Sequence, residues 1–337
     1  MEDRKALEAE RARLMARLGE IDAQLRAAEL GDALAASGDW GWALLSSTGL
    51  IGRWDSPDPL PPTGPRSTHD VIVSAARSTG VVGVLTSAGR IVRVPTHELP
   101  DIPVGDHAPN LLGAGMAANL LSLPPGERAI GLTSLGPQTF GWALGTRRGV
   151  VKRTNPEIPR GQDSWEVIRL DEGDEVVGAV ELRHEQQQLV FVTDDAQLLR
   201  YPASAVRPQG RQGGGMVGIR LDADAKVVFF GAADLRDSLV VTNAGRRSAI
   251  DSDAGGSLKV TPFDAFPEKG RATGGVRCHR FLKGEDVLYL AWVGPQPAIA
   301  ATRTGSPSNL PPVDPKRDGT GTPTSLRITG VGTRAWA

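Results

Sequence analysis

Residues 81–95 read VVGVLTSAGRIVRVP. Apolar side chains fill both ends of this stretch, and four small or polar residues lie between them, from Thr86 to Gly89. Two short apolar runs joined by a few turn residues are typical of a β-hairpin. Glycine suits the closing position because tight hairpin turns usually need a left-handed residue, which a side chain disfavours. The stretch therefore predicts two antiparallel strands.

The same pattern occurs six times along the chain. The six hairpins are WGWALLSSTGLIGRW (40–54), VVGVLTSAGRIVRVP (81–95), TFGWALGTRRGVVKRT (139–154), LVFVTDDAQLLRYP (189–202), SLVVTNAGRRSAI (238–250) and PAIAATRTGSPSNL (297–310). The turns open on Ser46, Thr86, Thr146, Thr193, Thr242 and Thr302, and they close on Gly49, Gly89, Gly149, Ala196, Gly245 and Gly305. The openers recur on average about every 51 residues, a spacing found in four-stranded propeller blades.

Each hairpin is followed by a further apolar strand, usually introduced by an acid. These strands are predicted within residues 69–75, 126–135, 173–182, 224–233, 284–293 and 325–332. Between hairpin and strand lies a loop rich in glycine or proline and often basic: 60–70, 111–120, 158–167, 206–218, 266–280 and 314–324. We therefore predict an all-β ring of six four-stranded antiparallel blades over residues 39–333, whose closure protects the sheet edges.

One N-terminal α-helix is predicted before the ring, within residues 1–31. Its apolar residues are Leu7, Leu14, Leu18, Ile21, Leu25 and Ala28, which form an a/d seam between charged faces. Two interpretations remain open: the helix packs on its own domain, or residues 2–30 join a partner helix in a coiled coil. We favour the coiled coil, because about three heptads with Gly19 among them need a partner for stability.

The composition limits the class of protein. A net charge of −1 argues against a uniformly basic nucleic-acid binder but leaves room for local basic patches. The single cysteine, Cys278, excludes an internal disulfide framework and cysteine-rich zinc sites. No apolar run approaches the ~20 residues that a membrane span needs, and the charged N-terminus is unlike a signal peptide. We expect a soluble, cytoplasmic protein that associates with the nucleoid and has no membrane contact.

The repeat resembles the C-terminal domain of the A subunit of bacterial type IIA topoisomerases, DNA gyrase and topoisomerase IV. The stretches VRPQGRQGGGMVGIRL (206–221) and EKGRATGGVRCHRFLKGED (268–286) carry the resemblance most specifically. It implies a six-bladed β-pinwheel that binds and bends double-stranded DNA around its rim. It also implies two partners: the catalytic core of a topoisomerase A subunit, together with an ATPase B subunit. The N-terminal helix is similar to a remnant of the coiled coil that precedes this domain in the family.

The chain departs from the family in two respects. Gyrase A subunits carry a basic box, QRRGGKG, in the first blade, whereas residues 62–69 read PTGPRSTH, with only Arg66 and His69 as candidate donors. That places the domain nearer to topoisomerase IV than to a strongly wrapping gyrase. Nothing resembles the catalytic core with its nucleophilic tyrosine, so we expect no catalytic residues and no enzymatic activity of this chain on its own.

The candidate DNA-binding residues are basic or amide side chains clustered in and near the loops. They are Arg66, His69, Arg147, Arg148, Lys152, Arg153, Arg160, Arg207, Gln209, Arg211, Arg220, Lys269, Arg271, Arg277, Lys316 and Arg317. Basic side chains gain from phosphate contact through counterion release, and glycine-loop amides can also donate to phosphates.

Other chemistry is weakly supported. The sequence contains no phosphate-binding loop motif for ATP, so we expect no cofactor. His97, Asp101 and His107 lie in a loop interrupted by prolines, so we expect no metal site. Cys278 and His279 are adjacent on a strand and point to opposite faces, which argues against a nucleophile–base pair. Two rival classes remain: a propeller-like protein-interaction scaffold without DNA binding, and a propeller enzyme with acids in its central channel.

Overall fold

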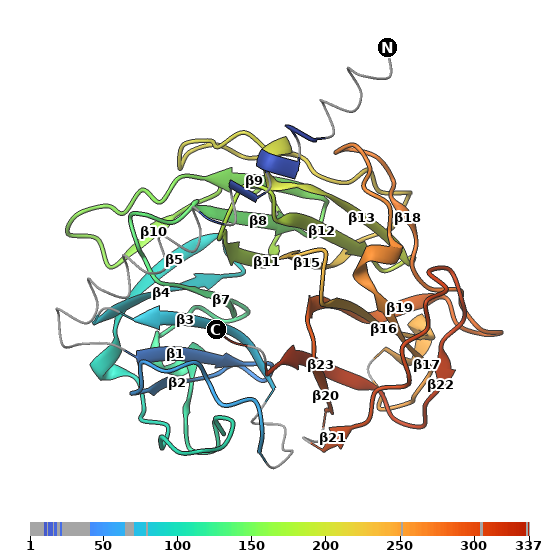
Figure 1. Cartoon of the computed structure of the whole chain (residues 1–337), viewed down its shortest axis with the longest axis horizontal. Helices are drawn as coiled ribbons and strands as arrows, with labels where there is room; N and C mark the ends of the chain where they lie inside the picture. Colours follow the sequence, from blue (N-terminus) through green and yellow to red (C-terminus); the bar gives the residue numbers. More distant parts are fainter. Residues whose placement is uncertain are drawn as a thin grey trace.

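Six antiparallel sheets form a ring in the computed structural model (Figure 1). The structure describes residues 10–11, 13–15, 17–18, 21, 41–64, 71–78, 80–250, 252–303, 306–334 and 336. Nearly all regular structure in the ring is strand; its helices are the single turn α2 (Ala117–Leu120) and four short 3-10 segments. The predicted all-β ring of six blades is therefore confirmed.

The first three blades contain four strands each, ordered from the centre of the ring outward. Blade 1 comprises β3 (Ile72–Ser78), β1 (Gly41–Ser46), β2 (Leu50–Trp54) and β6 (Gly115–Met116). Blade 2 comprises β7 (Ala129–Thr133), β4 (Val81–Thr86), β5 (Arg90–Pro95) and β10 (Ser164–Glu166). Blade 3 comprises β11 (Val176–Glu181), β8 (Trp142–Thr146), β9 (Val150–Thr154) and β14 (Met216–Val217).

The last three blades follow the same order. Blade 4 comprises β15 (Val227–Ala233), β12 (Gln188–Thr193), β13 (Gln197–Pro202) and β18 (Val276–Arg277). Blade 5 comprises β19 (Val287–Pro295), β16 (Ser238–Gly245), β17 (Ser257–Pro262) and β22 (Thr322–Pro323). Blade 6 has three strands among the described residues: β23 (Ile328–Thr333), β20 (Ala298–Thr302) and β21 (Pro307–Ser308).

The outermost strand of each four-stranded blade comes from the following repeat. The chain leaves β13 of blade 4, runs back to blade 3 as β14, and then returns to blade 4 as β15. The loop 206–218 is predicted between the hairpin and the further strand of the fourth repeat, but Met216 at its end pairs with Val151 of blade 3. The strand exchange ties neighbouring blades together because each repeat completes the sheet of the one before it.

Four hairpin turns adopt the predicted geometry. The closing residues Gly49, Gly89, Gly149 and Ala196 have φ angles of 84°, 75°, 82° and 66°. Each donates its backbone N–H to the carbonyl of the opener three residues earlier, as in the 2.9 Å bond from Gly89 to Thr86. The openers are buried, so the Ser/Thr hydroxyls lie inside the ring rather than on its surface.

The fifth hairpin differs from the prediction. Thr242 and Gly245 lie within β16, which continues to Gly245 and pairs with β17 and β19 on its two sides. The strands are joined instead by residues 246–256, which include the 3-10 segment Arg247–Ala249. The strand extends past Thr242 because Asn243 donates to the carbonyl of Ser257 and accepts the N–H of Ile328, at 3.1 and 3.0 Å. Of the sixth turn, Gly305 lies outside the described residues.

The core lies between blades rather than within a single sheet. One cluster joins Val190 and Val192 of blade 4 to Val240 and Leu288 of blade 5, and similar clusters join most other neighbours. The innermost strands approach closely: a Cβ on Gly178 would lie 2.0 Å from the carbonyl oxygen of Phe230. β23 contacts β3, and this contact closes the ring between blades 6 and 1.

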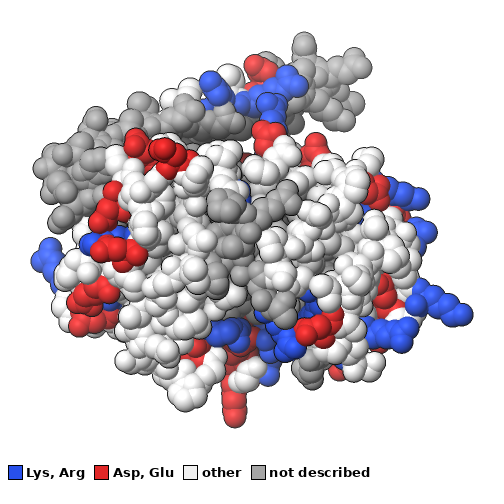
Figure 2. Space-filling view, turned by 90° about the horizontal axis from the view of Figure 1, so that it is seen from below, with Lys and Arg blue, Asp and Glu red and all other residues white. Residues whose placement is uncertain are grey.

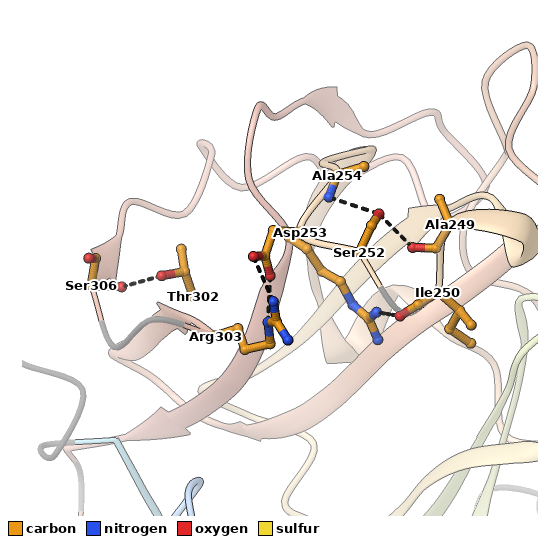
Figure 3. A network of polar contacts seen from close by, with 9 residues as sticks. Ala249, Ile250, Ser252, Asp253, Ala254, Thr302, Arg303 and Ser306 are labelled. Carbon is orange, nitrogen blue, oxygen red and sulfur yellow. Dashed lines mark hydrogen bonds and ion pairs between the residues drawn. The ribbon is translucent and has the colours of Figure 1, made fainter.

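Polar contacts also link the last two blades (Figure 3). Arg303, after β20, forms two hydrogen bonds with the carboxylate of Asp253, in the segment between β16 and β17. Arg327 donates to the carbonyl of Ile250 and lies 4.3 Å from the ring centre of Tyr289. The long connection of the fifth hairpin is therefore fastened to blade 6.

The described residues between Glu10 and Ile21 are helical, as predicted. Leu14 and Leu18 of the predicted seam are 61% and 58% exposed, so they do not pack against the ring. A coiled-coil partner for this helix stays a prediction, and so does the domain boundary, because residues 32–38 lie outside the described part of the chain. None of the helices within the described residues has the length and apolar content of a membrane crossing.

Candidate nucleic-acid interface

Five connecting segments lie along the outer edge of the ring, each directly before the outermost strand of a blade. We call them the rim loops: residues 100–114, 155–163, 207–215, 267–275 and 311–321. Each rim loop forms backbone hydrogen bonds with the same position of the third strand of its blade, which is Arg53, Arg93, Arg153, Arg200 or Val260. The repeated attachment places the five loops in equivalent positions around the rim.

Positive charge is unevenly distributed among these loops. Loop 207–215 contains Arg207 and Arg211 and no acid, and loop 267–275 contains two basic residues and one acid. The loops 155–163 and 311–321 each carry two acids beside their basic residues, and loop 100–114 has no lysine or arginine. The strongest attraction for phosphate is therefore on the edges of blades 3 and 4.

The two most basic rim loops lie side by side. Ala272 of loop 267–275 donates its N–H to the carbonyl of Gly218, directly after β14, at 2.9 Å. The Arg271 guanidinium donates to the carbonyl of Val217 at 2.5 Å, so part of its donor capacity is used within the protein. Arg207 and Lys269 are exposed on this edge, while Arg211 is half-buried.

Lys152 is a correction to the predicted set. It is 0% exposed, and its Nζ donates to the carbonyls of Gly210, Arg211 and Gly213, each at 2.8 Å. Burial lowers the pKa of this ammonium to about 8, although the charge of Glu157 acts in the opposite direction. Strand alternation turns this side chain under the neighbouring loop, so Lys152 supports the surface instead of forming it.

Two other predicted residues also have structural contacts. Arg153 is 5% exposed and donates to Glu185 at 2.5 Å, so it does not face the surface as we predicted. Gln209 is half-buried, and its side-chain amide brackets Gly215, accepting the N–H at 3.0 Å and donating to the carbonyl at 3.3 Å. These side chains shape the rim loop more than they present donors to a ligand.

The remaining predicted residues are exposed or half-buried. Arg147 and Arg148 follow β8, where Arg147 pairs with Glu175. Arg160 and Arg277 are exposed, as is Lys316, while Arg317 is half-buried and gives its carbonyl to the ammonium of Lys259. Arg66 and His69, the candidates in the first blade, lie outside the described residues.

A repeated arginine was missed by the sequence reasoning at two of its three positions. Strand pairing aligns Glu166, Val217 and Arg277 at the end of the outermost strands, and three residues later come Arg169, Arg220 and Arg280. We call these three the junction arginines. All are exposed, and their backbone N–H groups donate to Gly213, Thr273 and Gly319 of the next rim loop. The phrases VIRL (167–170) and GIRL (218–221) were the signal that could have revealed them.

The junction arginines extend the basic region over four blades. They occur at the junctions of blades 2 and 3, 3 and 4, and 4 and 5, whereas the equivalent positions at the other described junctions are Asn119 and Leu326. Arg280 lies 3.5 Å from Asp318, so its charge is partly balanced.

The opposite edge of the ring, with blades 1 and 6, faces the viewer in Figure 2 and is covered mainly by uncharged side chains, with a local patch of Lys and Arg beside acids.

The residues that we weighed for catalysis are buried or occupied. Cys278 is buried, which raises its thiol pKa to about 12, and its Sγ lies 3.3 Å from the carbonyl oxygen of Ala196. His279 lies between the hydroxyls of Thr242 and Ser257, at 2.9 and 3.0 Å. No group of three metal-binding side chains occurs among the residues that the structure describes.

Comparisons with solved structures agree with the ring. The C-terminal domain of DNA topoisomerase IV superposes with a TM-score of 0.65 over 87% of this chain and 92% of that chain, at 19% identity. A DNA gyrase A C-terminal domain superposes with a TM-score of 0.59 over 87% of this chain and 99% of that chain, at 14% identity. Because both sequence identities are low, these superpositions establish a shared fold and nothing more.

Sequence comparisons point to the same family of domains. The family model described as DNA gyrase C-terminal domain, beta-propeller, matches residues 84–103, 187–234 and 254–291. The DNA gyrase A subunit of Helicobacter pylori is 29% identical over 217 residues, covering 62% of this chain and 23% of the relative. Topoisomerase subunit TopoM of Mycolicibacterium smegmatis is 28% identical over 172 residues, covering 50% of this chain and 22% of the relative.

The chain spans less than a quarter of the length of these curated relatives. The matched segments include β12 to β15, and β17 to the first part of β19, and they contain the two most basic rim loops, 207–215 and 267–275, in full. The order of strands, the exchange between blades and the sequence matches agree with one another. The chain is similar, in sequence over part of its length and in fold over most of it, to the C-terminal β-propeller domains of the DNA gyrase A subunit.

Proposed function

We propose that this domain binds double-stranded DNA along the rim of blades 2 to 5 and bends it, as part of a type II DNA topoisomerase A subunit. The observation that carries the proposal is the recurrence of an exposed arginine at one structural position in three consecutive junctions, beside the acid-free rim loop 207–215. Equivalent positions on successive blades offer charge at regular intervals, which suits the phosphates of a duplex that follows the ring.

The proposed contacts are to the DNA backbone. Arginine and lysine side chains on loops neutralise phosphates, and such contacts position a duplex without reading its sequence. The surface contributors are Arg147, Arg148, Arg160, Arg169, Arg207, Arg211, Arg220, Lys269, Arg271, Arg277, Arg280, Lys316 and Arg317. We expect affinity that falls steeply with salt and depends little on base sequence.

Bending is proposed to be modest. The edge of blades 1 and 6 is mainly uncharged in Figure 2, and the junction arginines stop at blade 5. Bending a 20–30 base-pair site by 40–90° costs on the order of 1–6 kcal/mol, which a partial track of contacts offsets only in part. This supports a function nearer to topoisomerase IV than to a strongly wrapping gyrase. Ligation of nicked DNA circles with the protein bound measures the resulting change in linking number. A large change, proportional to the amount of bound protein, would contradict modest bending.

The activity of the whole protein is part of the proposal. Its similarity to gyrase A C-terminal domains supports a role in holding DNA during strand passage at the nucleoid, together with a DNA-cleaving core and an ATP-hydrolysing partner subunit. We propose that the chain alone neither cleaves nor relaxes DNA. Incubating supercoiled plasmid with the pure protein checks this, and relaxed or cleaved product would refute it.

The binding experiment compares the wild type with the variant R207A/R211A/K269A/R271A over a salt series. Arg207 and Lys269 are exposed, and Arg211 and Arg271 are half-buried at the surface. Because surface substitutions usually change stability by less than about 0.5 kcal/mol each, the fold should persist. The slope of log affinity against log salt should decrease by up to about 4 × 0.9 if all four side chains neutralise phosphates. Unchanged slope and affinity would favour a protein-interaction scaffold, or a DNA track that avoids these loops.

A further inference from the structure

The rim loop 207–215 is held from below by a single buried ammonium. Lys152 projects from β9, and its Nζ lies 2.8 Å from each of the carbonyl oxygens of Gly210, Arg211 and Gly213. Its three protons are therefore all donated to the loop backbone. The Gly213 carbonyl also accepts the N–H of the junction arginine Arg169, at 3.3 Å.

The orientation of these carbonyls decides where the loop amides point. In a trans peptide the N–H is directed away from the C=O of the same unit. The three carbonyls converge inward on Lys152, so the N–H groups of Arg211, Gln212 and Gly214 point outward. None of the three has a hydrogen bond within the described part of the chain, and Gln212 and Gly214 are exposed.

A second side chain fixes the end of the same loop. Gln209 accepts the N–H of Gly215 at 3.0 Å and donates to its carbonyl at 3.3 Å, which ties the last residue of the loop to its third. Gly210 has open space where a Cβ would lie, so a ligand can approach the backbone there. The loop is thus shaped by one fully buried side chain, Lys152, and one half-buried side chain, Gln209.

We propose that the outward amides of Arg211, Gln212 and Gly214 form a phosphate site for the DNA backbone, and that Lys152 is the positioning residue that creates it. This rests on the proposed DNA-binding function. Consecutive backbone N–H groups directed at one side form concavities that bind anions. Arg207 and Arg211 add charge beside the amides, whereas Lys152 contributes no direct contact because it is fully buried.

Blade 5 offers a contrast at the equivalent strand position. Lys259 is also buried, but its Nζ donates to the Thr261 hydroxyl and to only one carbonyl of the next rim loop, that of Arg317, at 3.1 Å. That loop carries Asp314 and Asp318, which repel phosphate. Among the described rim loops, loop 207–215 on blade 3 combines three inward-facing carbonyls with the absence of acidic residues.

The experiment measures binding of a duplex of about 20 base pairs by K152M, which keeps the length of the side chain and removes its charge. The matched control is K226M, which removes an exposed lysine outside the rim loops. We expect K152M to bind about tenfold more weakly, as for the loss of one or two charge-assisted hydrogen bonds. The slope of its log affinity against log salt should change by less than ~0.9, the value for one phosphate contact, because Lys152 itself contacts no phosphate.

Amide resonances distinguish positioning from a general loss of structure. Duplex DNA should shift the N–H signals of Arg211, Gln212 and Gly214 in the wild type and not in K152M. Wild-type affinity should also fall from pH 7 to pH 9 more than that of K152M, because the pKa of Lys152, which burial lowers to about 8 against the charge of Glu157, lies in this range. Circular dichroism checks the fold of K152M; if K152M is unfolded, Q209A, which loosens the same loop, takes its place.

The outcomes separate this inference from the proposed function. If the wild type binds DNA with salt dependence and K152M matches it, the amide site is refuted and DNA binding stands. A decrease of ~0.9 in the slope of log affinity against log salt for K152M would also refute the positioning role, since Lys152 would then contact a phosphate directly. If the wild type does not bind DNA, the proposed function itself fails.

Discussion

Arg303 and Asp253 are 50 positions apart in the chain and form a two-pronged ion pair, with Nε–Oδ1 and Nη2–Oδ2 distances of 2.6 and 2.9 Å (Figure 3). The separation equals about one repeat, so the pair joins blades 5 and 6. Related pairs join other blades: Arg183 with Asp234, and Arg247 with Asp194 at 3.0 Å. Ionic contacts between repeats therefore supplement the apolar clusters at the junctions.

The pair between Arg303 and Asp253 should have a small, salt-dependent effect on stability. Both side chains are largely exposed, at 63% and 44%, and water screens such pairs. We expect R303A to melt slightly below the wild type at low salt, with the difference shrinking at high salt. Arg303 holds the pKa of Asp253 below its usual value, so the contribution is present above pH ~4 and disappears as the pH falls through the lowered pKa. Thermal melts at neutral and acidic pH measure this, and R236A serves as control.

Replacing the junction arginines should weaken DNA binding without unfolding the ring. For R169A/R220A/R280A we expect the salt slope to decrease by up to about 3 × 0.9, with the affinity loss similar for all DNA sequences. The control R128A/R236A/R303A removes the same charge from exposed positions outside the rim. If both triple variants lose equal affinity, net charge rather than the repeated position attracts DNA.

His279 should make the ring sensitive to acid. Burial, and secondarily the charge of Lys259, lowers its pKa to about 4, whereas an unfolded histidine titrates near 6.5. The unfolded state then binds more protons between these values, so stability is complete above pH ~6.5 and is lost as the pH falls towards 4. The shift corresponds to about 3 kcal/mol at most.

The variant H279I tests this contribution, because the equivalent residues of the preceding junctions are Ile168 and Ile219. Urea unfolding of H279I should show a flatter dependence of the unfolding free energy on pH between 7 and 4. It should also be less stable at neutral pH, since the hydroxyls of Thr242 and Ser257 lose a partner. An identical pH dependence in both proteins would show that His279 is not the group responsible.

Gly89 should be more sensitive to substitution than Gly113, although both have positive φ. A Cβ on Gly89 at φ 75° would lie 2.4 Å from Cγ2 of Ile168, while one on Gly113 at φ 93° would have open space. We expect G113A to cost about 1 kcal/mol of unfolding free energy from backbone strain, and G89A distinctly more from strain and clash together. Denaturant unfolding compares them, and equal costs would mean that Ile168 moves aside.

Sequence patterns located the hairpins wherever the turn was short. Thr86 and Gly89, or Thr193 and Ala196, mark a local geometry that a few residues define through a left-handed closer and one backbone hydrogen bond. The pattern misled at Thr242 and Gly245, because Asn243 bonds to Ser257 and to Ile328, the latter 85 positions away, and such partners leave no local signal. The same limit applies to the candidate site, where clustering of charge identified the basic loops but not which cations are exposed.

Periodicity and composition predict six repeats of apolar strands and turns and a concentration of arginine and lysine in glycine-rich loops. Two stretches, 206–221 and 268–286, carry the resemblance to a known family. The three-dimensional structure was needed to show that β14 completes blade 3 rather than blade 4, that Lys152 lies under a loop 58 positions away, and that Arg169, Arg220 and Arg280 share one position. The reason is physical. Turns are local and legible in a few residues, whereas strand exchange and burial depend on contacts between segments that meet only when the ring has closed.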